Sequence, residues 1–328
     1  KSINETTTSP FESVDPFIGT GGHGHTFPGA TRPFGMVQLS PDTYNKGWDW
    51  CSGYHYSDSS IMGFSHTHLS GTGRGDLLDI LVMPGTGDIH FIPGSRENPD
   101  EGYRSRFSHS DEHASPGYYS VLLKDYQILA ELTTTPRAGF HRYTFPESDN
   151  SHILIDLFHG YATDSVLETY VAILDDSTVT GYRKSRGWGE GMEKYWAEQE
   201  IYFAAKFSKP FKSAGIAEDQ LPLEGKSSAT GRNLKAFVNY STISGEQILV
   251  KIGISSVNIE GALNNLNSEI SGWDFGKIQN EAKIEWEEHL NKIEIVEAEE
   301  NTKQIFYTAL YHSMIAPYTY SDVDGRYR

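Results

Sequence analysis

The chain has 328 residues, of which 37% are hydrophobic, and a formal net charge of −17. This length suffices for one large domain or two of ordinary size, and the acidic charge disfavours nucleic-acid binding because it repels phosphate. No apolar run approaches the roughly 20 residues of a membrane helix, so we expect neither a nucleic-acid partner nor a membrane span. The single cysteine, Cys51, excludes an internal disulfide framework.

The N-terminal part is rich in glycine and proline. Residues 1–13 are polar and predict a flexible lead; they lack the apolar core of a signal peptide, which indicates a mature or an intracellular N-terminus. Over residues 14–88, Gly and Pro interrupt every apolar run, so we expect short strands and long loops. The run at 77–83 predicts the first buried strand, closed by Pro84 and Gly85, and the polar segment 92–117 predicts an excursion from the sheet.

The middle of the chain alternates apolar and polar residues, as half-buried strands do. Tyr119, Val121 and Leu123 fall on one face, and residues 128–132 repeat the alternation after a turn. The further strands that we expect are 140–145, 152–158, 177–183, 200–207, 236–240 and 247–254. Many short strands with turn signals between them predict a mainly β fold, an antiparallel β-sandwich.

The pattern changes from strand to helix at Ser255. Apolar residues at helical spacing predict helical stretches at 259–270 and 275–290. The apolar face of the second stretch is Phe275, Ile278, Ala282, Trp286 and Leu290. After a charged break at 297–300, a third pattern predicts a helix capped by Asn301 or Thr302 and ended by Pro317. Its expected apolar stripe is Ile305, Phe306, Ala309, Leu310 and Met314.

Helices at the end of a β domain, the last with a broad apolar face, are an unusual stopping place. We therefore infer that the chain is the front part of a longer protein whose second, all-α domain has barely begun. The expected division is a lead over 1–13, a β-sandwich over 14–255, linker helices over 256–300 and the start of the helical domain over 301–328.

Aromatic and polar residues are interleaved with glycine between Gly47 and Tyr56. The aromatic members are Trp48, Trp50, Tyr54 and Tyr56, and they stand beside Asp49, Ser52 and His55. Aromatic faces next to short polar side chains suit a sugar, which presents apolar C–H faces and hydroxyl edges. The alternative is a sandwich core with buried tryptophan, although two indoles in a Gly-flanked loop are hard to bury on both faces.

Two histidine pairs, His23-Gly-His25 and His66-Thr-His68, each place two imidazoles on one side of an extended segment. Completed by Asp76 or Asp79, they could hold zinc; without a His-Glu-x-x-His signature, they equally suit hydrogen-bonding roles in loops. The glycine run 19–24 lacks the Lys-Ser/Thr ending and the βαβ context of a nucleotide-binding loop. We expect it to form a tight backbone wall against a ligand, or a β-bulge.

Carboxylates are the groups that glycosidic hydrolysis requires, about 6.5–9.5 Å apart for inversion and about 5–5.5 Å for retention. The candidates in the glycine-rich region are Asp42, Asp49, Asp58, Asp76 and Asp79, for which turn and capping roles are the alternative. The segment Asp322-Val-Asp-Gly325 begins like a calcium loop but lacks the later EF-hand ligands, so it equally suits a turn. We interpret Cys51 as a packed thiol.

Residues 14–42, which contain Val14-Asp-Pro-Phe-Ile-Gly-Thr-Gly-Gly22, resemble the opening of the family 92 glycoside hydrolases, the calcium-dependent exo-α-mannosidases. The resemblance continues in the same order through Gly53-Tyr-His-Tyr56, Gly63-Phe-Ser-His-Thr-His-Leu-Ser-Gly-Thr-Gly73, Pro116-Gly-Tyr-Tyr119, Glu131-Leu-Thr133, Ala138-Gly-Phe-His-Arg-Tyr-Thr-Phe145, Phe306-Tyr-Thr-Ala-Leu-Tyr-His312 and Ser321-Asp-Val-Asp-Gly-Arg-Tyr327. It therefore runs from about Val14 to the last residue, which is far more specific than any single motif.

The resemblance implies an N-terminal β-sandwich of the supersandwich type, followed by linker helices and the first helix of an (α/α)6 barrel. It implies an inverting, secreted, periplasmic or cell-surface enzyme that acts on mannose-rich N-glycans, with α-1,2 as the expected linkage. Calcium is the implied cofactor and contacts the mannose hydroxyls. In the family the catalytic acid, the catalytic base and the main calcium ligands lie in the barrel, so we expect none of them in this chain.

What the resemblance implies for this chain is part of the sugar pocket, at the interface with its own C-terminal (α/α)6 domain. The residues expected there are Trp50, with Trp48 second, Gly21, Gly22, His66 and His68 in the pocket wall, and Asp322 and Asp324 reaching the sugar hydroxyls. The chain alone should then bind a mannoside weakly and hydrolyse nothing. The alternatives are a non-catalytic carbohydrate-binding β-sandwich and a zinc hydrolase built on the two histidine pairs.

Overall fold

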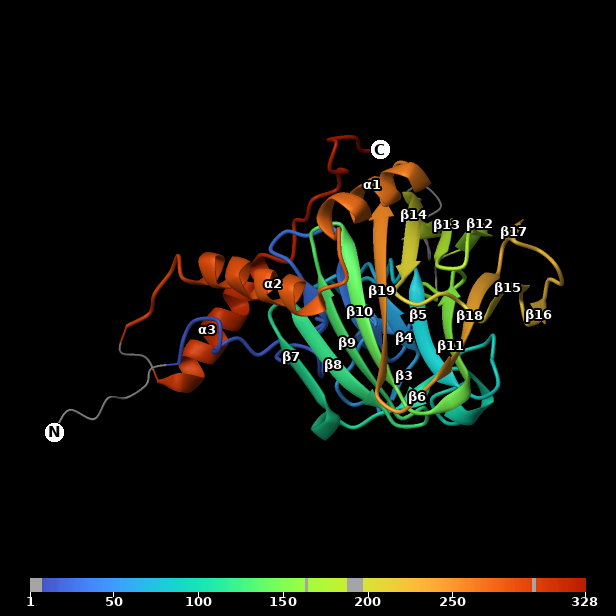
Figure 1. The fold of residues 1–328 in the computed structure, drawn as a ribbon. Helices are drawn as coiled ribbons and strands as arrows, with labels where there is room; N and C mark the ends of the chain where they lie inside the picture. Colours follow the sequence, from blue (N-terminus) through green and yellow to red (C-terminus); the bar gives the residue numbers. More distant parts are fainter. Residues whose placement is uncertain (1–7, 163–164, 188–196, 297–298) are drawn as a thin grey trace.

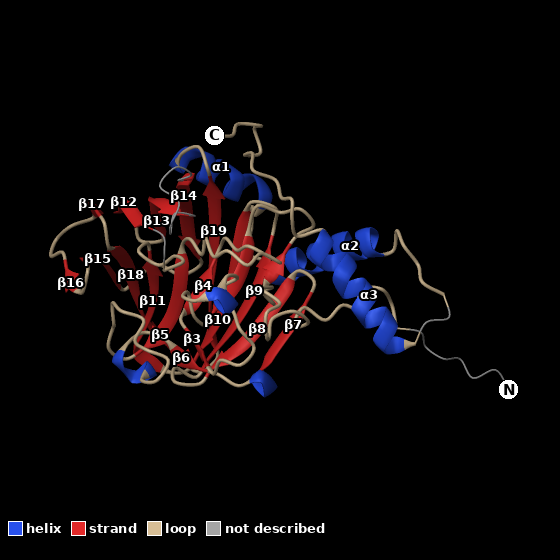
Figure 2. Ribbon diagram, turned by 180° about the vertical axis from the view of Figure 1, so that it is seen from behind, coloured by secondary structure: helices blue, strands red, loops and turns tan. Residues whose placement is uncertain are grey.

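Two large antiparallel sheets form the body of the molecule in the computed structural model, which describes residues 8–162, 165–187, 197–296 and 299–328 (Figures 1 and 2). One sheet has eight strands in the order β1-β2-β4-β5-β11-β18-β15-β16. Its strands are β1 (Ala30–Thr31), β2 (Gln38–Asp42), β4 (Gly63–Ser65), β5 (Leu81–Thr86), β11 (Ser148–Asp156), β15 (Ser213–Glu218), β16 (Leu221–Pro222) and β18 (Leu234–Thr242).

The other large sheet has nine strands in the order β17-β12-β13-β14-β19-β10-β9-β8-β7. Its strands are β7 (Glu112–Ser115), β8 (Tyr118–Leu123), β9 (Ile128–Thr134), β10 (Ala138–Phe145), β12 (Ser165–Ile173), β13 (Thr178–Gly187), β14 (Ala197–Phe207), β17 (Ser228–Gly231) and β19 (Glu246–Ser255). A small sheet pairs β3 (Ser60–Ile61) with β6 (Ser105–Arg106). The predicted antiparallel sandwich is confirmed.

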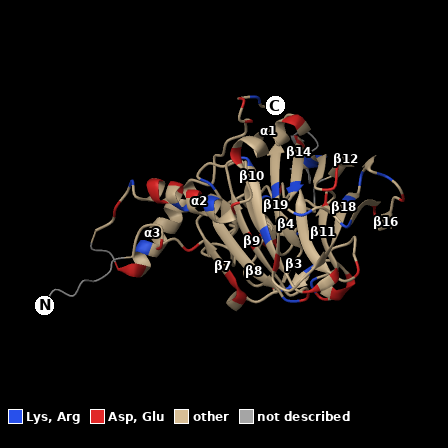
Figure 3. Ribbon diagram, in the orientation of Figure 1, with Lys and Arg blue, Asp and Glu red and all other residues tan. Residues whose placement is uncertain are grey.

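The core lies between the two large sheets and follows the predicted alternation. Tyr119, Val121 and Leu123 on β8 are fully buried, and Val121 pairs with Ala130 on β9. One large apolar cluster joins these strands to the facing strands of the other sheet, such as β5 and β11. Charged residues occur on the helices and loops and also on several strands, among them β10 and β19 (Figure 3).

The strand predicted at 77–83 is wrong in its limits. Strand β5 begins only at Leu81 and continues through Pro84 to Thr86. The preceding residues Leu77, Leu78 and Ile80 have positive φ angles between 57° and 70°, which no extended strand allows. Asp79 lies among them and is fully buried, so the chain turns there to bury a carboxylate.

Helices α1 (Ile259–Glu269) and α2 (Phe275–Leu290) follow β19, as the change of pattern at Ser255 predicts. The buried face of α2 is the predicted one, Phe275, Ile278, Ala282, Trp286 and Leu290. Asn258 caps α1 by accepting a hydrogen bond from the backbone of Gly261. Helix α1 lies across the ends of β14 and β19, whereas α2 and α3 project to one side (Figure 1).

Helix α3 (Glu300–Ser313) exists, and its predicted apolar stripe is right only in part: Met314 is buried, and Phe306 and Leu310 are partly buried against the same cluster. Its buried residues are Lys303, Tyr307, Thr308 and Tyr311. Ile305, from the predicted stripe, is 55% exposed. The N-cap is Glu299 instead of Asn301 or Thr302, and its side chain makes no capping hydrogen bond. Helix α3 therefore packs through Tyr307, Thr308 and Tyr311 together with apolar residues of the predicted stripe.

The N-terminal segment packs against α3. Residues 1–7 of the predicted flexible lead lie outside the described residues. Ser13 donates its backbone N–H to the Ser9 carbonyl, and Thr8 donates its hydroxyl to Glu300 at 2.8 Å. Within the described part of the chain, each helix is too short or too polar to cross a membrane.

Candidate functional site

Trp48 is exposed beside the glycine-rich loop. It begins a short 3-10 helix, η1 (Trp48–Trp50), which follows Gly47 at a φ of 94°. The His25 ring meets the indole edge-on with centroids 4.5 Å apart, and the His23 ring lies 4.8 Å away. Even so, Trp48 is 54% exposed. Its neighbours therefore hold the indole in place while leaving much of it open.

The loop from Gly19 to His25 lies next to this tryptophan and is fixed at several points. The Thr20 carbonyl accepts a hydrogen bond from the Tyr56 backbone at 2.9 Å, and His55 lies 3.2 Å from the Gly22 carbonyl. Gly22 has a φ of 58°, and no atom lies within 4 Å of the position of a Cβ. The surface of the loop at Gly22 is therefore exposed to solvent. We call Trp48, His23, His25, Gly21 and Gly22 the Trp48 shelf.

A second glycine loop, residues 71–75, closes one side of the shelf. A Cβ on Gly73 would lie 2.7 Å from Trp48 Nε1, and one on Gly75 would lie 2.1 Å from the Tyr161 ring. Gly71 donates its backbone N–H to the His25 carbonyl at 2.7 Å. Larger residues at Gly73 and Gly75 would displace these rings, so the glycines permit the close approach.

Asp49 supplies a negative charge to the shelf. One of its carboxylate oxygens lies 2.6 Å from His23 Nδ1. Burial lowers the pKa of His25 from its ordinary value, and the Asp49 carboxylate partly opposes this effect. The shelf thus combines an exposed indole, imidazole edges and one carboxylate, which can pack against an apolar ring face and hydrogen-bond with hydroxyl groups.

Trp50, the residue that the resemblance favours for the sugar contact, makes its contacts with other side chains of the protein. Its Nε1–H donates to the Asp58 carboxylate at 2.7 Å. The Arg96 guanidinium lies 4.6 Å from the centre of the indole, and the Tyr44 ring meets it edge-on. Burial is intermediate. Trp50 therefore fastens η1 to the loop that carries Arg96.

His66 lies inside the sandwich in a chain of hydrogen bonds. Its Nδ1–H donates to the Ile80 carbonyl at 2.8 Å, and its Nε2 lies 3.2 Å from Nε2 of His141. Tyr143 lies 2.8 Å from Nδ1 of His141. Burial lowers the pKa of His66 to about 4 and that of His141 well below its ordinary value. Both rings are therefore neutral. Each group then donates one hydrogen bond to the next, in the order Tyr143, His141, His66 and the Ile80 carbonyl.

His68 is buried beside a carboxylate. Its Nδ1 lies 2.7 Å from the Gln38 carbonyl and its Nε2 lies 2.9 Å from Asp42. The other Asp42 oxygen lies 2.8 Å from His159 Nε2. Although burial opposes ionisation of Asp42, the two imidazoles lower its pKa to about 2. Both ring nitrogens of His68 therefore have oxygen partners inside the protein, and the Ser65 hydroxyl lies 3.2 Å from Nε2 as well.

Asp79, considered above as a zinc ligand, forms a buried ion pair with Arg183 of β13. Its carboxylate also accepts hydrogen bonds from Thr67, at 2.7 Å, and from Gln199. These contacts join the turn at 77–80 to the nine-stranded sheet. In the sequence, Asp79 is a single carboxylate within an apolar run, whereas Arg183 and Gln199 stand among other polar residues of β13 and β14.

Asp322 and Asp324 have different surroundings. Asp322 is 1% exposed, and its two oxygens accept hydrogen bonds from Ser255 at 2.8 Å and Asn265 at 2.7 Å. Asp324 is exposed and pairs with Arg326 at 2.8 Å. Asp322 thus ties the C-terminal segment to α1 and the end of β19.

The described residues do not assemble a metal site: in residues 8–162, 165–187, 197–296 and 299–328, no three or more His, Cys, Asp or Glu side chains are placed to hold an ion. His23 and His25 lie at the shelf, whereas His66 and His68 are buried with partners of their own, so the zinc alternative is not supported. These residues do not fit a calcium site either. Cys51 is buried, as predicted, and burial raises its pKa.

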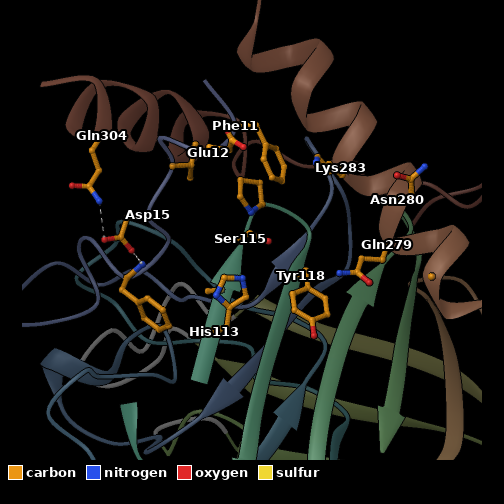
Figure 4. A pocket seen from close by; sticks show the side chains of 15 residues that line it. Phe11, Glu12, Asp15, His113, Ser115, Tyr118, Gln279, Asn280, Lys283 and Gln304 are labelled. Carbon is orange, nitrogen blue, oxygen red and sulfur yellow. Dashed lines mark hydrogen bonds between the residues drawn. The ribbon is translucent and has the colours of Figure 1, made fainter. Parts of the chain in front are cut away.

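The structure also contains a cavity that the sequence does not reveal. It has a volume of about 770 Å³ and lies between the N-terminal segment, the β7–β8 turn and α2 (Figure 4). Its lining comes from four separate stretches of the chain. The polar residues on α2, such as Gln279 and Lys283, look in the sequence like an ordinary solvated helix face.

The comparisons with known proteins agree with this architecture. The model of the glycosyl hydrolase family 92 N-terminal domain matches residues 13–255, and that of the family 92 catalytic domain matches residues 261–328. A solved family GH92 α-mannosidase from Bacteroides thetaiotaomicron, in complex with mannoimidazole, is 41% identical with a TM-score of 0.92. That match covers 98% of this chain and 42% of that chain.

Two more distant relatives point the same way. The GH92 family glycosyl hydrolase ccman5 is 26% identical with a TM-score of 0.84, over 98% of this chain and 43% of that chain. A protein of Arthroderma benhamiae described as an uncharacterized secreted glycosidase is 26% identical over 337 residues, which are 94% of this chain and 42% of that protein. The chain thus spans less than half the length of these relatives. Since the two family models together match most of its residues, the chain belongs to glycosyl hydrolase family 92.

Proposed function

We propose that this chain is the sugar-recognising front portion of an inverting exo-α-mannosidase that trims mannose-rich N-glycans, with α-1,2 linkages as its substrate. Support comes from membership of family 92 and from a 41% identical relative that is an α-mannosidase. In this proposal the division at residues 13, 255 and 300 separates the lead, the sandwich, the linker helices and the barrel. The protein works outside the cytoplasm, in line with the secreted relative.

The observation that carries the proposal is the exposed indole of Trp48. Sugar rings pack their C–H faces on exposed aromatic rings, and Trp48 is 54% exposed with His23, His25 and Asp49 around it. Trp50 has its N–H bound to Asp58. We therefore assign the sugar contact to Trp48 and a positioning role to Trp50.

The remaining expected site residues divide in the same way. Gly21 and Gly22 are exposed at the shelf and stay in the proposed pocket wall. His66 and His68 are buried with protein partners, and so is Asp322, which makes them supports of the site. Asp324 remains a candidate for sugar hydroxyls because it is exposed.

The catalytic acid and base are proposed to lie in the remainder of the protein. Hydrolysis with inversion needs one carboxylic acid and one carboxylate on opposite sides of the glycosidic bond. The carboxylates nearest the shelf are already engaged: Asp49 by His23, and Asp58 by Trp50 and Arg96. Calcium, the family's cofactor, is likewise assigned to the remainder of the protein.

The test is binding and hydrolysis of α-1,2-mannobiose. We expect the 328-residue chain to bind the disaccharide at millimolar concentration without releasing mannose, and the full-length protein to release it. Trp48→Ala should weaken binding at least tenfold. Trp273→Ala is the matched control, because Trp273 is also exposed, at 39%, and packs near Lys251 away from the shelf. Mannose release by the chain alone, or equal binding by the Trp48 and Trp273 variants, would refute the proposal.

The second candidate function, a non-catalytic carbohydrate-binding sandwich, rests on the same indole. The two functions differ in the full-length protein. A mannosidase of this family should lose hydrolysis when a chelator removes calcium, while binding to the Trp48 shelf of this chain stays unchanged. A full-length protein that binds mannobiose but never releases mannose would favour the binding module.

A further inference from the structure

The cavity between the N-terminal segment and α2 has the size and lining of a ligand site. Its volume of about 770 Å³ falls in the range of about 300–1,000 Å³ that is usual for small-molecule pockets. The floor comes from the β7–β8 turn, one wall from residues 11–17 and the other from α2, with Gln304 contributed by α3 (Figure 4). Four separate parts of the chain therefore line it.

Neutral groups that both donate and accept hydrogen bonds line this cavity. In Figure 4 the Gln279 side chain extends from α2 toward Tyr118, while Gln304 and Asp15 face each other on the opposite side. Gln304 donates to an Asp15 oxygen at a long 3.3 Å, and the Phe17 backbone donates to the other oxygen at 3.0 Å. Ser115 adds a hydroxyl. Amides and hydroxyls match a ligand whose own groups also donate and accept.

Aromatic rings supply the apolar part of the lining. Phe17 and Tyr118 are half-buried, and the Tyr118 hydroxyl is fixed by Glu131 at 2.9 Å. The His113 ring lies 6.1 Å from that of Tyr118. The cavity thus offers ring faces beside amide groups, a combination that suits a ligand with apolar faces and polar edges.

The charges around the cavity disfavour anionic ligands. Asp15 and Glu12 are both acidic, which is unfavourable for a phosphate or sulfate group. The Lys283 ammonium also lines the cavity, and its positive charge partly offsets the charges of Asp15 and Glu12. It lies 5.5 Å from the centre of the Phe11 ring and 3.8 Å from Glu287. Glu12 in turn accepts hydrogen bonds from Ser9. A neutral ligand avoids the cost of burying an unpaired charge here.

From this lining we propose that the cavity binds a neutral saccharide at a site separate from the Trp48 shelf. The two sites are joined through one segment of the chain. Phe17 lines the cavity and meets Tyr56 edge-on at 5.9 Å, and Tyr56 in turn donates its backbone N–H to the carbonyl of Thr20, next to Gly21 of the shelf. The proposal does not depend on the shelf binding mannose.

Gly276 provides a way to fill the cavity without disturbing the fold. It lines the cavity in the first turn of α2, and a Cβ added there would have Asp274 Oδ1 as its nearest neighbour, at 3.6 Å. Its φ is not positive, so other residues are tolerated. Gly276→Trp should occupy the cavity, and Gly276→Ala, which adds only a methyl group, is the matched control.

The test measures saccharide binding in Trp48→Ala protein, so that the shelf does not contribute. The probes are α-1,2-mannobiose and maltose, observed by saturation-transfer NMR, and melting temperatures verify that each variant is folded. We expect at least one probe to bind at tens of millimolar, Gly276→Ala to change its affinity less than twofold, and Gly276→Trp to weaken it at least tenfold. Gln279→Ala should weaken it about fivefold, which corresponds to the loss of one hydrogen bond.

The outcomes separate this proposal from the proposed function. If neither probe binds once Trp48 is replaced, or if the Gly276→Trp and Gly276→Ala variants bind equally, the cavity is not a saccharide site. Gly276→Trp in a protein with Trp48 intact should leave shelf binding unchanged. Loss of all binding in that variant would show that the shelf assignment is wrong while the cavity assignment holds.

Discussion

The hydrogen-bond chain through His66 and His141 yields a sharp stability prediction. Each proton position follows from its neighbour: the Ile80 carbonyl can only accept, so His66 carries its proton on Nδ1. Because both rings are neutral, Nε2 of His66 accepts from His141, whose Nδ1 then accepts from the Tyr143 hydroxyl. Tyr143→Phe removes the only donor at the start of this chain.

The magnitude follows from leaving one buried acceptor without a partner. His141 and Tyr143 are both fully buried, so water does not replace the lost hydroxyl. An unsatisfied buried polar group costs about 1–3 kcal/mol. The other neutral tautomer of His141, with its proton on Nδ1, does not restore the lost hydrogen bond, because Nε2 of His141 and Nε2 of His66 would then face each other without a proton. With a urea m-value of about 3 kcal/mol per molar, the midpoint should fall by about 0.3–1 M.

Tyr240→Phe is the matched control. Tyr240 is also fully buried, but its hydroxyl has no hydrogen-bond partner among the described residues. Removing that hydroxyl should therefore leave the urea midpoint unchanged or raise it slightly. Unfolding is followed by tryptophan fluorescence in urea. Equal midpoints for the Tyr143 and Tyr240 variants would contradict the proton assignment in the chain.

Three further predictions concern pH, a buried charge and a close contact. The pKa of His66 is about 4 in place of its ordinary 6.5, so its neutral form stabilises the fold fully above pH 6.5. About 3 kcal/mol should be lost as the pH falls toward 4, and urea midpoints that stay level over this range would contradict it. Asp42→Asn removes the buried carboxylate that contacts both His68 and His159 and should cost about 3–5 kcal/mol in urea unfolding; an unchanged midpoint would contradict the importance of these contacts. Gly253→Ala places a methyl group 2.3 Å from a carbonyl oxygen of α1 and should cost about 1–3 kcal/mol in urea unfolding. Gly272→Ala is the control: no atom lies within 4 Å of the added methyl group, so the urea midpoint should stay unchanged.

Period-two alternation located the strands because one face of each is buried between the sheets. Strands β8 and β9 show this most clearly, since the residues predicted to share a face also pair across the ladder. The run at 77–83 misled for a physical reason. Its apolar residues are buried as a strand would require, but Asp79 is paired with Arg183, and the backbone takes positive φ angles to reach it.

The two long helices show where apolar spacing succeeds and where it fails. Helix α2 packs through an apolar face, and spacing predicted all five of its buried residues. Helix α3 packs in part through its predicted apolar stripe, but its most buried positions also include groups that a hydropathy pattern counts as polar. Thr308 accepts a hydrogen bond from the Asp15 backbone at 2.9 Å, and the Tyr307 hydroxyl lies 3.2 Å from the Ile293 carbonyl. Polar partners far along the chain decided which face is buried.

The sequence indicated the neighbourhood of the shelf but not which indole faces outward. Trp48 and Trp50 have the same flanking glycines and lie on the same short helix. What separates them is Arg96, which stacks on Trp50 and also bonds Asp58, the acceptor of the Trp50 N–H. A contact from so distant a loop leaves no trace in the spacing of the motif itself.

The segment His66-Thr67-His68 explains how buried polar residues can serve an exposed site. Each of its three side chains has a different partner: Ile80 and His141 for the first, Asp79 for the second, Gln38 and Asp42 for the third. The segment is therefore fixed to both large sheets. Three residues later the chain reaches Gly71, which bonds the His25 carbonyl, and then Gly73, which lies against the Trp48 indole. Histidines that look like ligands in the sequence thus act from inside the sandwich, because they fix the loop that sets the position of the exposed tryptophan.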